Sequence, residues 1–366
     1  MSAKPHILFI LHLPPPVHGA AMVGQYIHDS APVNAGFDCR FINLTTAGGM
    51  GDIGRFKWKK IRPFLALLRR IRKEVKEFRP ELVYVTPNAR GGPFYKDFAV
   101  VMMLKRMGCR VVAHYHNKGV AARQDRPLDD FLYRRFFKGL KVILLSEKLY
   151  PDIRKYVKRG DVLVCPNGIP CGTAPLRDAP GDGTPRILFL SNLLAGKGIL
   201  VLLDALGLLE KKGLRFDCAL VGGETQDFDT LRLEEAVRQR ELEGCVHYLG
   251  RKEGEDKAAC LERADLFVLP SLDECFPLVL LEAMAHGLPC ISTDEGGITD
   301  IIDDGVTGLI ARKRDPADLA EKIGTLLEDA SLRRQMGAAA REKYDGLFTL
   351  EKFERRFTDC LHALLE

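Results

Sequence analysis

The chain has 366 residues, of which 46% are apolar, 28% charged and 8% aromatic. This composition excludes a disordered chain, and the length exceeds what one hydrophobic core usually supports, so two globular domains are expected. The ten cysteines form no Cys-x-x-Cys pair and no zinc-type cluster, which predicts reduced thiols in a cytoplasmic protein without a metal. No apolar stretch approaches the roughly 20 residues of a membrane span, and prolines at 14–16 interrupt the apolar start, which argues against a secretion signal.

The charges are distributed unevenly along the chain. Residues 1–180 carry a net charge of +17 and residues 181–366 a net charge of −12. Segment 55–79 contains 11 Lys and Arg residues, and its apolar residues after Pro63 recur at helical spacing. The pattern predicts a basic amphipathic helix. This helix either docks peripherally on an anionic membrane or is simply exposed to solvent on its basic face. A nucleic-acid partner is not favoured, because the segment has few aromatic residues and no RNA-reading motif.

Short runs of branched apolar residues alternate with segments of helical period. The predicted strands are 6–11, 38–43, 82–86, 110–114, 142–145, 162–165, 186–191, 216–221, 245–249, 266–269 and 289–293. The predicted helices include 20–30, 60–78, 94–107, 128–138, 198–211, 228–241, 254–263, 276–286 and 316–328. This alternation is typical of an α/β fold with parallel sheets and crossover helices.

The alternation stops where Gly, Pro and Asp become dense and then starts again. We therefore expect an N-terminal Rossmann-like domain at 1–170, a linker at 171–185 and a second Rossmann-like domain at 186–345. A C-terminal helix at 346–366 is expected to pack back on the first domain. Ligands of such sheets bind at the carboxyl ends of the strands, so the active site is expected in a cleft between the two domains.

One stretch of the second domain, residues 270–289, carries the most chemical information. Glu274 follows a predicted strand, and Glu282 lies eight residues later on the helix predicted to begin at Phe276. The N–H groups of Leu278 and Val279 would lack helical acceptors and could bind a diphosphate. Gly296 and Gly297 could add backbone donors or could form only a turn, and the two glutamates could equally be ordinary helix and cap residues.

These residues resemble the nucleotide-sugar half of retaining glycosyltransferases of family 4, which have the GT-B fold. The resemblance rests on Glu274-x7-Glu282, on the Glu-Ala-Met-Ala-x-Gly-x-Pro run to Pro289, and on the glycine turns ending at Gly297 and Gly308. It implies that Glu282 holds the donor ribose and that Glu274 contacts the transferred sugar. Lys197 would neutralise the departing diphosphate.

Other site residues follow from weaker matches to the same family. The family commonly has an arginine where this chain has Asn192, and an amide cannot replace a charged guanidinium. Asn192 is therefore assigned only a weak role in donor binding. Gly19 and Ala20 would approach the donor phosphates from the first domain. The resemblance gives a contact with the donor sugar to His116 first and to His114 second.

The resemblance implies sugar transfer from a nucleoside diphosphate with retention at the anomeric carbon. We expect front-face displacement without a metal or cofactor, because no pair of carboxylates suggests a glycosidase-type nucleophile. The acceptor is expected to be a glycan or a lipid-linked glycan in surface polysaccharide synthesis. Two alternatives stay open: a sugar-nucleotide epimerase of the same architecture, and a catalytically silent partner of another transferase.

Overall fold

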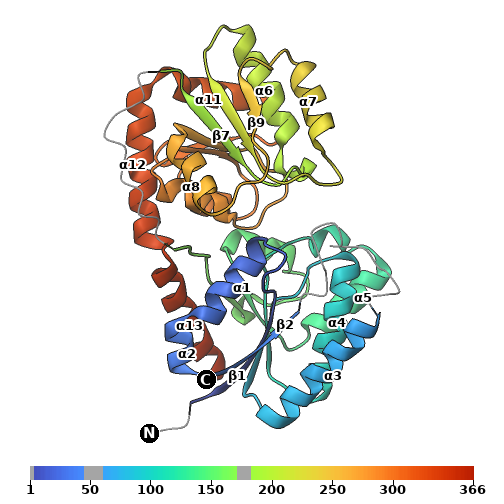
Figure 1. Cartoon of the computed structure of the whole chain (residues 1–366). Helices are drawn as coiled ribbons and strands as arrows, with labels where there is room; N and C mark the ends of the chain where they lie inside the picture. The colour runs from blue at the N-terminus through green and yellow to red at the C-terminus, as the bar shows by residue number, and fades with distance from the viewer. Residues whose placement is uncertain (1–3, 45–60, 171–182) are drawn as a thin grey trace. The chain divides into compact units, whose positions relative to one another are not determined.

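The structure is a computed structural model that describes residues 4–44, 61–170 and 183–366 (Figure 1). The chain divides into two compact units, Met1–Asn167 with Leu350–Glu366, and Gly168–Thr349. Each unit contains one six-stranded sheet whose paired strands are all parallel. The predicted α/β class with two Rossmann-like halves is confirmed. Most of the linker predicted at 171–185, and the start of segment 55–79, lie outside the described residues.

In the sheet of the first unit, the direction in which successive strands are added reverses between β1 and β3. Its order is β2-β1-β3-β4-β5-β6, so the loops after β1 and β3 leave the carboxyl edge at the topological switch point. The strands are β1 (His6–Leu11), β2 (Asp38–Asn43), β3 (Leu82–Val85), β4 (Val111–His114), β5 (Lys141–Leu144) and β6 (Val162–Val164).

Helices cover both faces of this sheet, with α1, α2 and α13 on one face and α3, α4 and α5 on the other (Figure 1). The helices are α1 (Gly19–Asp29), α2 (Ala31–Gly36), α3 (Ile61–Phe78), α4 (Gly91–Arg106), α5 (Pro127–Phe137) and α13 (Leu350–Leu365), with short 3-10 turns η3 (Ala121–Arg123), η4 (Glu147–Asp152) and η5 (Arg159–Asp161). On α13, the Phe357 ring lies 5.4 Å from Tyr84 of β3. The C-terminal helix thus completes the core of the first unit.

The second unit repeats the same architecture. Its sheet order is β12-β11-β10-β7-β8-β9, with the switch point between β7 and β10. The strands are β7 (Arg186–Leu190), β8 (Asp217–Val221), β9 (Val246–Tyr248), β10 (Leu266–Leu269), β11 (Cys290–Thr293) and β12 (Gly308–Ala311). The helices are η6 (Ala195–Lys197), α6 (Ile199–Lys211), α7 (Thr230–Arg238), α8 (Gly254–Arg263), α9 (Leu278–Ala285), α10 (Ile298–Ile301), α11 (Pro316–Glu328) and α12 (Ala330–Leu347).

All eleven predicted strands are present, and no strand end is shifted by more than one residue. Strand β12 was not predicted, because it is only four residues long and begins with a glycine. Helices α2, α10 and α12 were not predicted either. The helix predicted from Phe276 begins instead at Leu278, because Pro277 takes the extended cap position. Across the described residues, no helix is both long and apolar enough to cross a membrane.

Helix α1 packs against the end of β1 through a glycine. A Cβ atom at Gly24 would lie 2.0 Å from the carbonyl oxygen of His12, so only a residue without a side chain fits there. Around Gly36, in contrast, a Cβ atom would meet no heavy atom within 4 Å. The tight packing at Gly24 fixes α1 over the switch point of the first sheet.

We expect Gly24→Ala to lower the free energy of unfolding by about 2 kcal/mol or more, because the new methyl group forces the helix away from the backbone of His12. Gly36→Ala is the matched control and should change stability by about 0.5 kcal/mol at most. Urea unfolding followed by circular dichroism measures both. Equal stability of the two variants would contradict the packing argument.

Candidate active site

The predicted donor residues of the second unit gather on loops at one edge of its sheet. Strand β10 pairs in parallel with both β7 and β11, so the loops after these three strands leave the same carboxyl edge. Lys197 follows β7, Glu274 follows β10, and Gly296 follows β11. The site therefore lies at the switch point, where α/β sheets commonly bind ligands.

The loop after β7 touches the loop after β10 through its backbone. Gly198 has φ +77°, and a Cβ atom there would lie 1.9 Å from the carbonyl oxygen of Pro270. The N–H of Leu272 donates to the carbonyl oxygen of Gly196 at 2.8 Å. This contact brings the ammonium of Lys197 into an ion pair with the carboxylate of Glu274. The side chains are 21% and 13% exposed, so both groups are shielded but reachable.

The loop after β11 closes the other side of Glu274. Gly296 has φ +57°, and a Cβ atom there would lie 2.2 Å from the carbonyl oxygen of Glu274. The N–H of Gly297 donates to the carbonyl oxygen of Cys275 at 2.7 Å. The N–H of Gly297 is therefore already hydrogen-bonded within the protein. Both glycines allow the backbone of this loop to pack against Glu274.

The first turn of α9 presents the backbone donors that were predicted. Leu278 and Val279 are partly exposed and occupy the first two helical positions, where N–H groups have no intrahelical acceptor. The sequence also assigns Phe276 to the donor site, and in the structure its side chain is only 4% exposed and its ring lies 5.8 Å from that of Phe348. The Phe276 side chain thus packs in the core of the unit, which leaves only its backbone for ligand contact.

Glu282 of α9 has a partner that the sequence did not reveal. The Nζ atom of Lys257, on α8, lies 2.7 Å from Oε1 and 2.6 Å from Oε2 of Glu282. The two side chains are 28% and 22% exposed. Nothing in the sequence pattern of α8 singles out Lys257, since the ion pair joins residues 25 positions apart on different helices. Both carboxylates of the Glu-x7-Glu pattern are therefore paired with a lysine.

Asn192 connects two loops of the second unit. Its side-chain Oδ1 accepts a hydrogen bond from the N–H of Gly223 at 3.2 Å, which ties the loop after β7 to the loop after β8. The Cδ atom of Arg251 would lie 3.8 Å from a Cβ atom at Gly223, and the Arg251 guanidinium lies 2.5 Å from Glu253. Asn192 thus has a structural contact, and Arg251 is a cation in its neighbourhood that the sequence prediction missed.

The prediction of a site without a metal overlooked an Asp-x-Asp sequence at Asp227-Phe228-Asp229. In the structure, Asp229 caps α7 by accepting from the N–H of Arg232 at 2.9 Å. Asp227 accepts from the N–H of Ala195 at 3.2 Å, next to the Lys197 turn. Across the described residues, no group of three or more His, Cys, Asp or Glu side chains could hold a metal ion.

In the first unit, the predicted phosphate loop opens α1. Gly19 and Ala20 are the first two residues of the helix, and Gly19 is exposed. His18 caps the helix, because its Nδ1 accepts from the N–H of Ala21 at 3.3 Å. The neutral His18 ring thereby takes the tautomer that carries its proton on Nε2.

The predicted histidines lie side by side at the end of β4, where His114 is the last residue of the strand and His116 lies two residues beyond it. The rings of His114 and His116 are 4.2 Å apart, and His114 shares a 2.7 Å hydrogen bond with the hydroxyl of Tyr84. Both ring nitrogens of His116 are buried and have no hydrogen-bond partner in the described part of the chain. Burial and the nearby His18 lower the pKa of His116 to about 3, and burial and nearby charges lower that of His12 also to about 3. His116 is thus a neutral imidazole with unused hydrogen-bonding capacity, as a ligand-binding residue would be.

Comparison with known families identifies the second unit. Residues 177–343 match the family model described as "Glycosyl transferases group 1". This match covers less than half of the chain and lies within the second unit. The amylovoran biosynthesis glycosyltransferase AmsK of Erwinia amylovora is 32% identical over 186 residues, which cover 49% of this chain and 45% of AmsK. The chain therefore matches less than half the length of this curated relative.

Two solved structures resemble the whole chain. Sucrose-phosphate synthase from Thermosynechococcus elongatus has a TM-score of 0.78 at 20% identity, with 99% of both chains covered. Anabaena Alr3699/HepE in complex with UDP-glucose has a TM-score of 0.75 at 18% identity, with 98% of this chain and 99% of that chain covered. These similarities confirm the predicted GT-B fold.

The buried histidines predict how stability depends on pH. Between about pH 6.5 and pH 3, His116 takes up a proton when unfolded but not when folded, so the free energy of unfolding falls as the pH falls. Each such histidine contributes at most about 1.4 kcal/mol per pH unit. His116→Gln should therefore make the pH dependence shallower by up to this amount.

The measurement is urea unfolding at a series of pH values, with His362→Gln as the control because His362 lies at the surface. If His116→Gln and His362→Gln show the same pH dependence as the unchanged protein, the argument that His116 stays neutral is wrong.

Proposed function

We propose that this protein is a retaining, metal-independent glycosyltransferase. It transfers a sugar from a nucleoside diphosphate sugar to a glycan or lipid-linked glycan acceptor, at the cytoplasmic face of the membrane in surface polysaccharide synthesis. The main support is the pair of lysine–carboxylate contacts at the switch point of a group 1 glycosyltransferase domain. The relationship to a glycosyltransferase of amylovoran biosynthesis supports the polysaccharide assignment.

The donor is proposed to bind along the edge formed by the three loops and α9. Glu282 would accept hydrogen bonds from the ribose hydroxyls, with Lys257 holding the carboxylate in one orientation. The free N–H groups of Leu278 and Val279, at the positive end of α9, would receive the diphosphate. HepE, whose structure contains UDP-glucose, supports a donor of this class.

Lys197 and Glu274 would act on the reacting sugar and its leaving group. Negative charge accumulates on the diphosphate as the sugar departs, and the Lys197 ammonium, held by Glu274, is placed to stabilise that charge. Retaining glycosidases need a nucleophilic carboxylate about 5 Å from a second carboxylate. Glu274 is instead paired with a cation, which favours front-face displacement in which the departing phosphate accepts the proton of the acceptor.

Residues of the first unit are also proposed to contact the donor. Gly19 and Ala20 would bring the first turn of α1 to the donor phosphates, and His116 would hydrogen-bond the transferred sugar as a neutral imidazole. A pKa of about 3 makes His116 unsuitable as a general base near neutral pH, so its proposed role is positioning.

The first test is a thermal-shift screen against UDP-, GDP-, ADP- and dTDP-sugars. One nucleotide class should raise the melting temperature, because a ligand of the folded state stabilises it. Glu282→Ala should abolish that rise. In Lys257→Met, where the carboxylate loses its partner, the donor dissociation constant should increase about tenfold, or about 1.4 kcal/mol.

Lys212→Met is the control, since Lys212 is an exposed lysine at the end of α6. Stabilisation of Glu282→Ala as large as that of the unchanged protein would show that Glu282 does not bind the donor. A silent partner protein would show no stabilisation by any donor. An epimerase would interconvert the donor, whereas a transferase should release nucleoside diphosphate when acceptor is added.

The exposed face of α3 supports the proposed membrane contact. Leu67, Ile71 and Val75 of this helix are buried, whereas the opposite face exposes a set of cations. These are Arg62, Arg69, Arg70, Arg72, Lys73 and Lys76. Leu65 is 44% exposed on the same helix. Such a face is attracted to anionic lipid by about 1 kcal/mol for each basic residue near the surface.

The protein is expected to float with anionic vesicles at low salt and to be released at high salt, where surface charges are screened. Replacing Arg69, Arg70 and Arg72 with Gln should abolish flotation. Replacing exposed Lys211 and Lys212 of the second unit with Gln is the control. Flotation that persists after the α3 replacement would show that α3 is not the docking element.

A further inference from the structure

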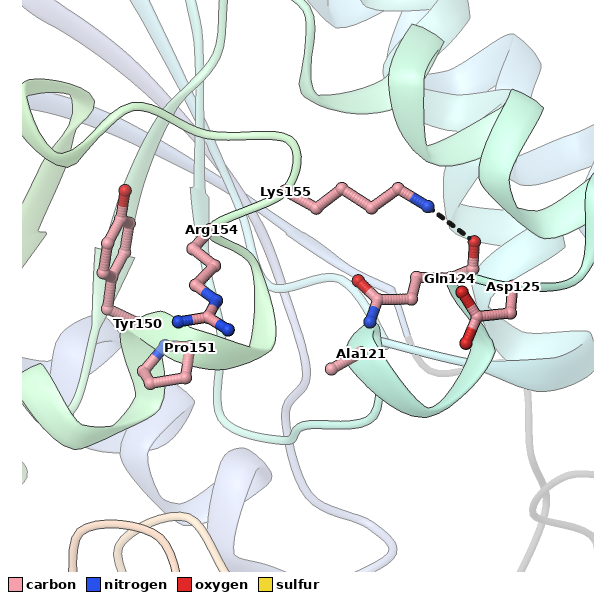
Figure 2. Close-up of a pocket in the computed structure, with 7 residues that line it drawn as sticks. All are labelled: Ala121, Gln124, Asp125, Tyr150, Pro151, Arg154 and Lys155. Carbon is pink, nitrogen blue, oxygen red and sulfur yellow. Dashed lines mark hydrogen bonds between the residues drawn. The ribbon is translucent and has the colours of Figure 1, made fainter.

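The loops after β4 and β5 flank an open cavity at the protein surface, and none of the residues predicted for the donor site lines it. Strands β4 and β5 are neighbours, so η3 and η4, which follow them, stand at the same carboxyl edge of the first sheet. Between them is a cavity of about 760 Å³, within the range of pockets that hold small molecules. Figure 2 shows this space with Tyr150 and Arg154 on one side and Gln124 and Asp125 on the other.

The walls of the cavity are fixed by hydrogen bonds between the two loops. The carboxylate of Asp152, in η4, accepts from the N–H groups of Gly119, Val120 and Ala121 at 2.9, 3.1 and 2.9 Å. The Nζ atom of Lys155 donates to the carbonyl oxygen of Gln124 at 2.8 Å (Figure 2). Lys155 is also paired with Asp130 at 2.9 Å. The two loops are therefore joined at both ends, and the cavity is preformed.

The polar groups that face the cavity are complementary to a charged sugar. Among the described residues, the guanidinium of Arg154 has no ion-pair or hydrogen-bond partner, whereas the charge of Lys155 is already matched by Asp130. Arg154 can therefore bind an anion through several N–H donors. On the opposite wall, the Asp125 carboxylate and the Gln124 side-chain amide also have no partner in the described chain.

The remaining wall favours a carbohydrate over an inorganic anion. The Asp125 carboxylate disfavours a small anion on its own side of the cavity, but it accepts hydrogen bonds well from the hydroxyls of a sugar whose anionic group lies at Arg154, on the opposite wall. Tyr150 and Pro151 add an apolar wall, and the Tyr150 hydroxyl is held by the carbonyl oxygen of Val157 at 3.0 Å. An apolar wall suits the C–H face of a sugar ring.

We propose that this cavity binds a saccharide unit of the acceptor that carries one anionic group, with Arg154 on the anion and with Asp125 and Gln124 on the hydroxyls. The proposal rests on the proposed function, because it names the chemical class of acceptor for that transferase. The anionic group is a carboxylate or a phosphate monoester, which share the geometry that a guanidinium recognises.

The test measures binding of four probes to the full chain by calorimetry: glucuronic acid, glucose 6-phosphate, glucose and inorganic phosphate. At least one anionic sugar should bind about tenfold or more tightly than both glucose and inorganic phosphate. Arg154→Gln should weaken that binding about tenfold, and Arg154→Lys should restore part of it. Arg106→Gln, which removes an exposed arginine from the end of α4, is the charge-matched control.

Tighter binding of glucuronic acid identifies a carboxylate, and tighter binding of glucose 6-phosphate identifies a phosphate. The proposal would be overturned if glucose or inorganic phosphate bound as tightly as the anionic sugars. It would also be overturned if Arg154→Gln bound the anionic sugar as tightly as the unchanged protein. The same samples are titrated with nucleoside diphosphate sugars. Loss of donor binding with intact sugar binding would count against the transferase and not against the cavity, and the reverse result would count against the cavity alone.

Discussion

The ion pair between Lys197 and Glu274 depends on the close approach of backbone to backbone at the switch point of the second sheet. Two glycines make this approach possible, since a Cβ atom at Gly198 or at Gly296 would collide with a carbonyl oxygen of the loop after β10. Both glycines also have positive φ values, which other residues adopt only with strain. The backbone contacts among the three loops around Glu274 thus fix the positions of the charged side chains.

Both glutamates of the candidate donor site are paired with lysines. Each carboxylate of the Glu-x7-Glu pattern has its own lysine, so neither of these two negative charges is left unmatched. This pairing would reduce the repulsion between these carboxylates and the phosphates of the proposed donor. In the first unit, burial keeps His12 and His116 neutral near pH 7. These two imidazoles therefore offer hydrogen-bonding nitrogen atoms without a positive charge.

Sequence periodicity predicted the large elements well and the small ones poorly. The strands of both sheets are runs of Val, Ile, Leu and Phe, and parallel strands buried on both faces must have this character. Strand β12 lacks such a run of large apolar residues, because it has four residues and begins with Gly308. It is recognised as a strand only by its pairing with β11. The start of α9 was placed at Phe276, whereas Pro277 takes an extended cap conformation and Phe276 packs against Phe348.

The sequence by itself determined the α/β class, the two Rossmann-like halves and the positions of Glu274, Glu282 and Lys197 on loops and helices. These properties depend on local periodicity and on short motifs, which are visible along the chain. Only the tertiary structure decided that Lys257 reaches Glu282, that Asn192 holds Gly223, and that Arg154 faces Asp125 and Gln124 across a cavity. These contacts join residues on separate elements, and the fold that brings them together leaves no local pattern in the sequence.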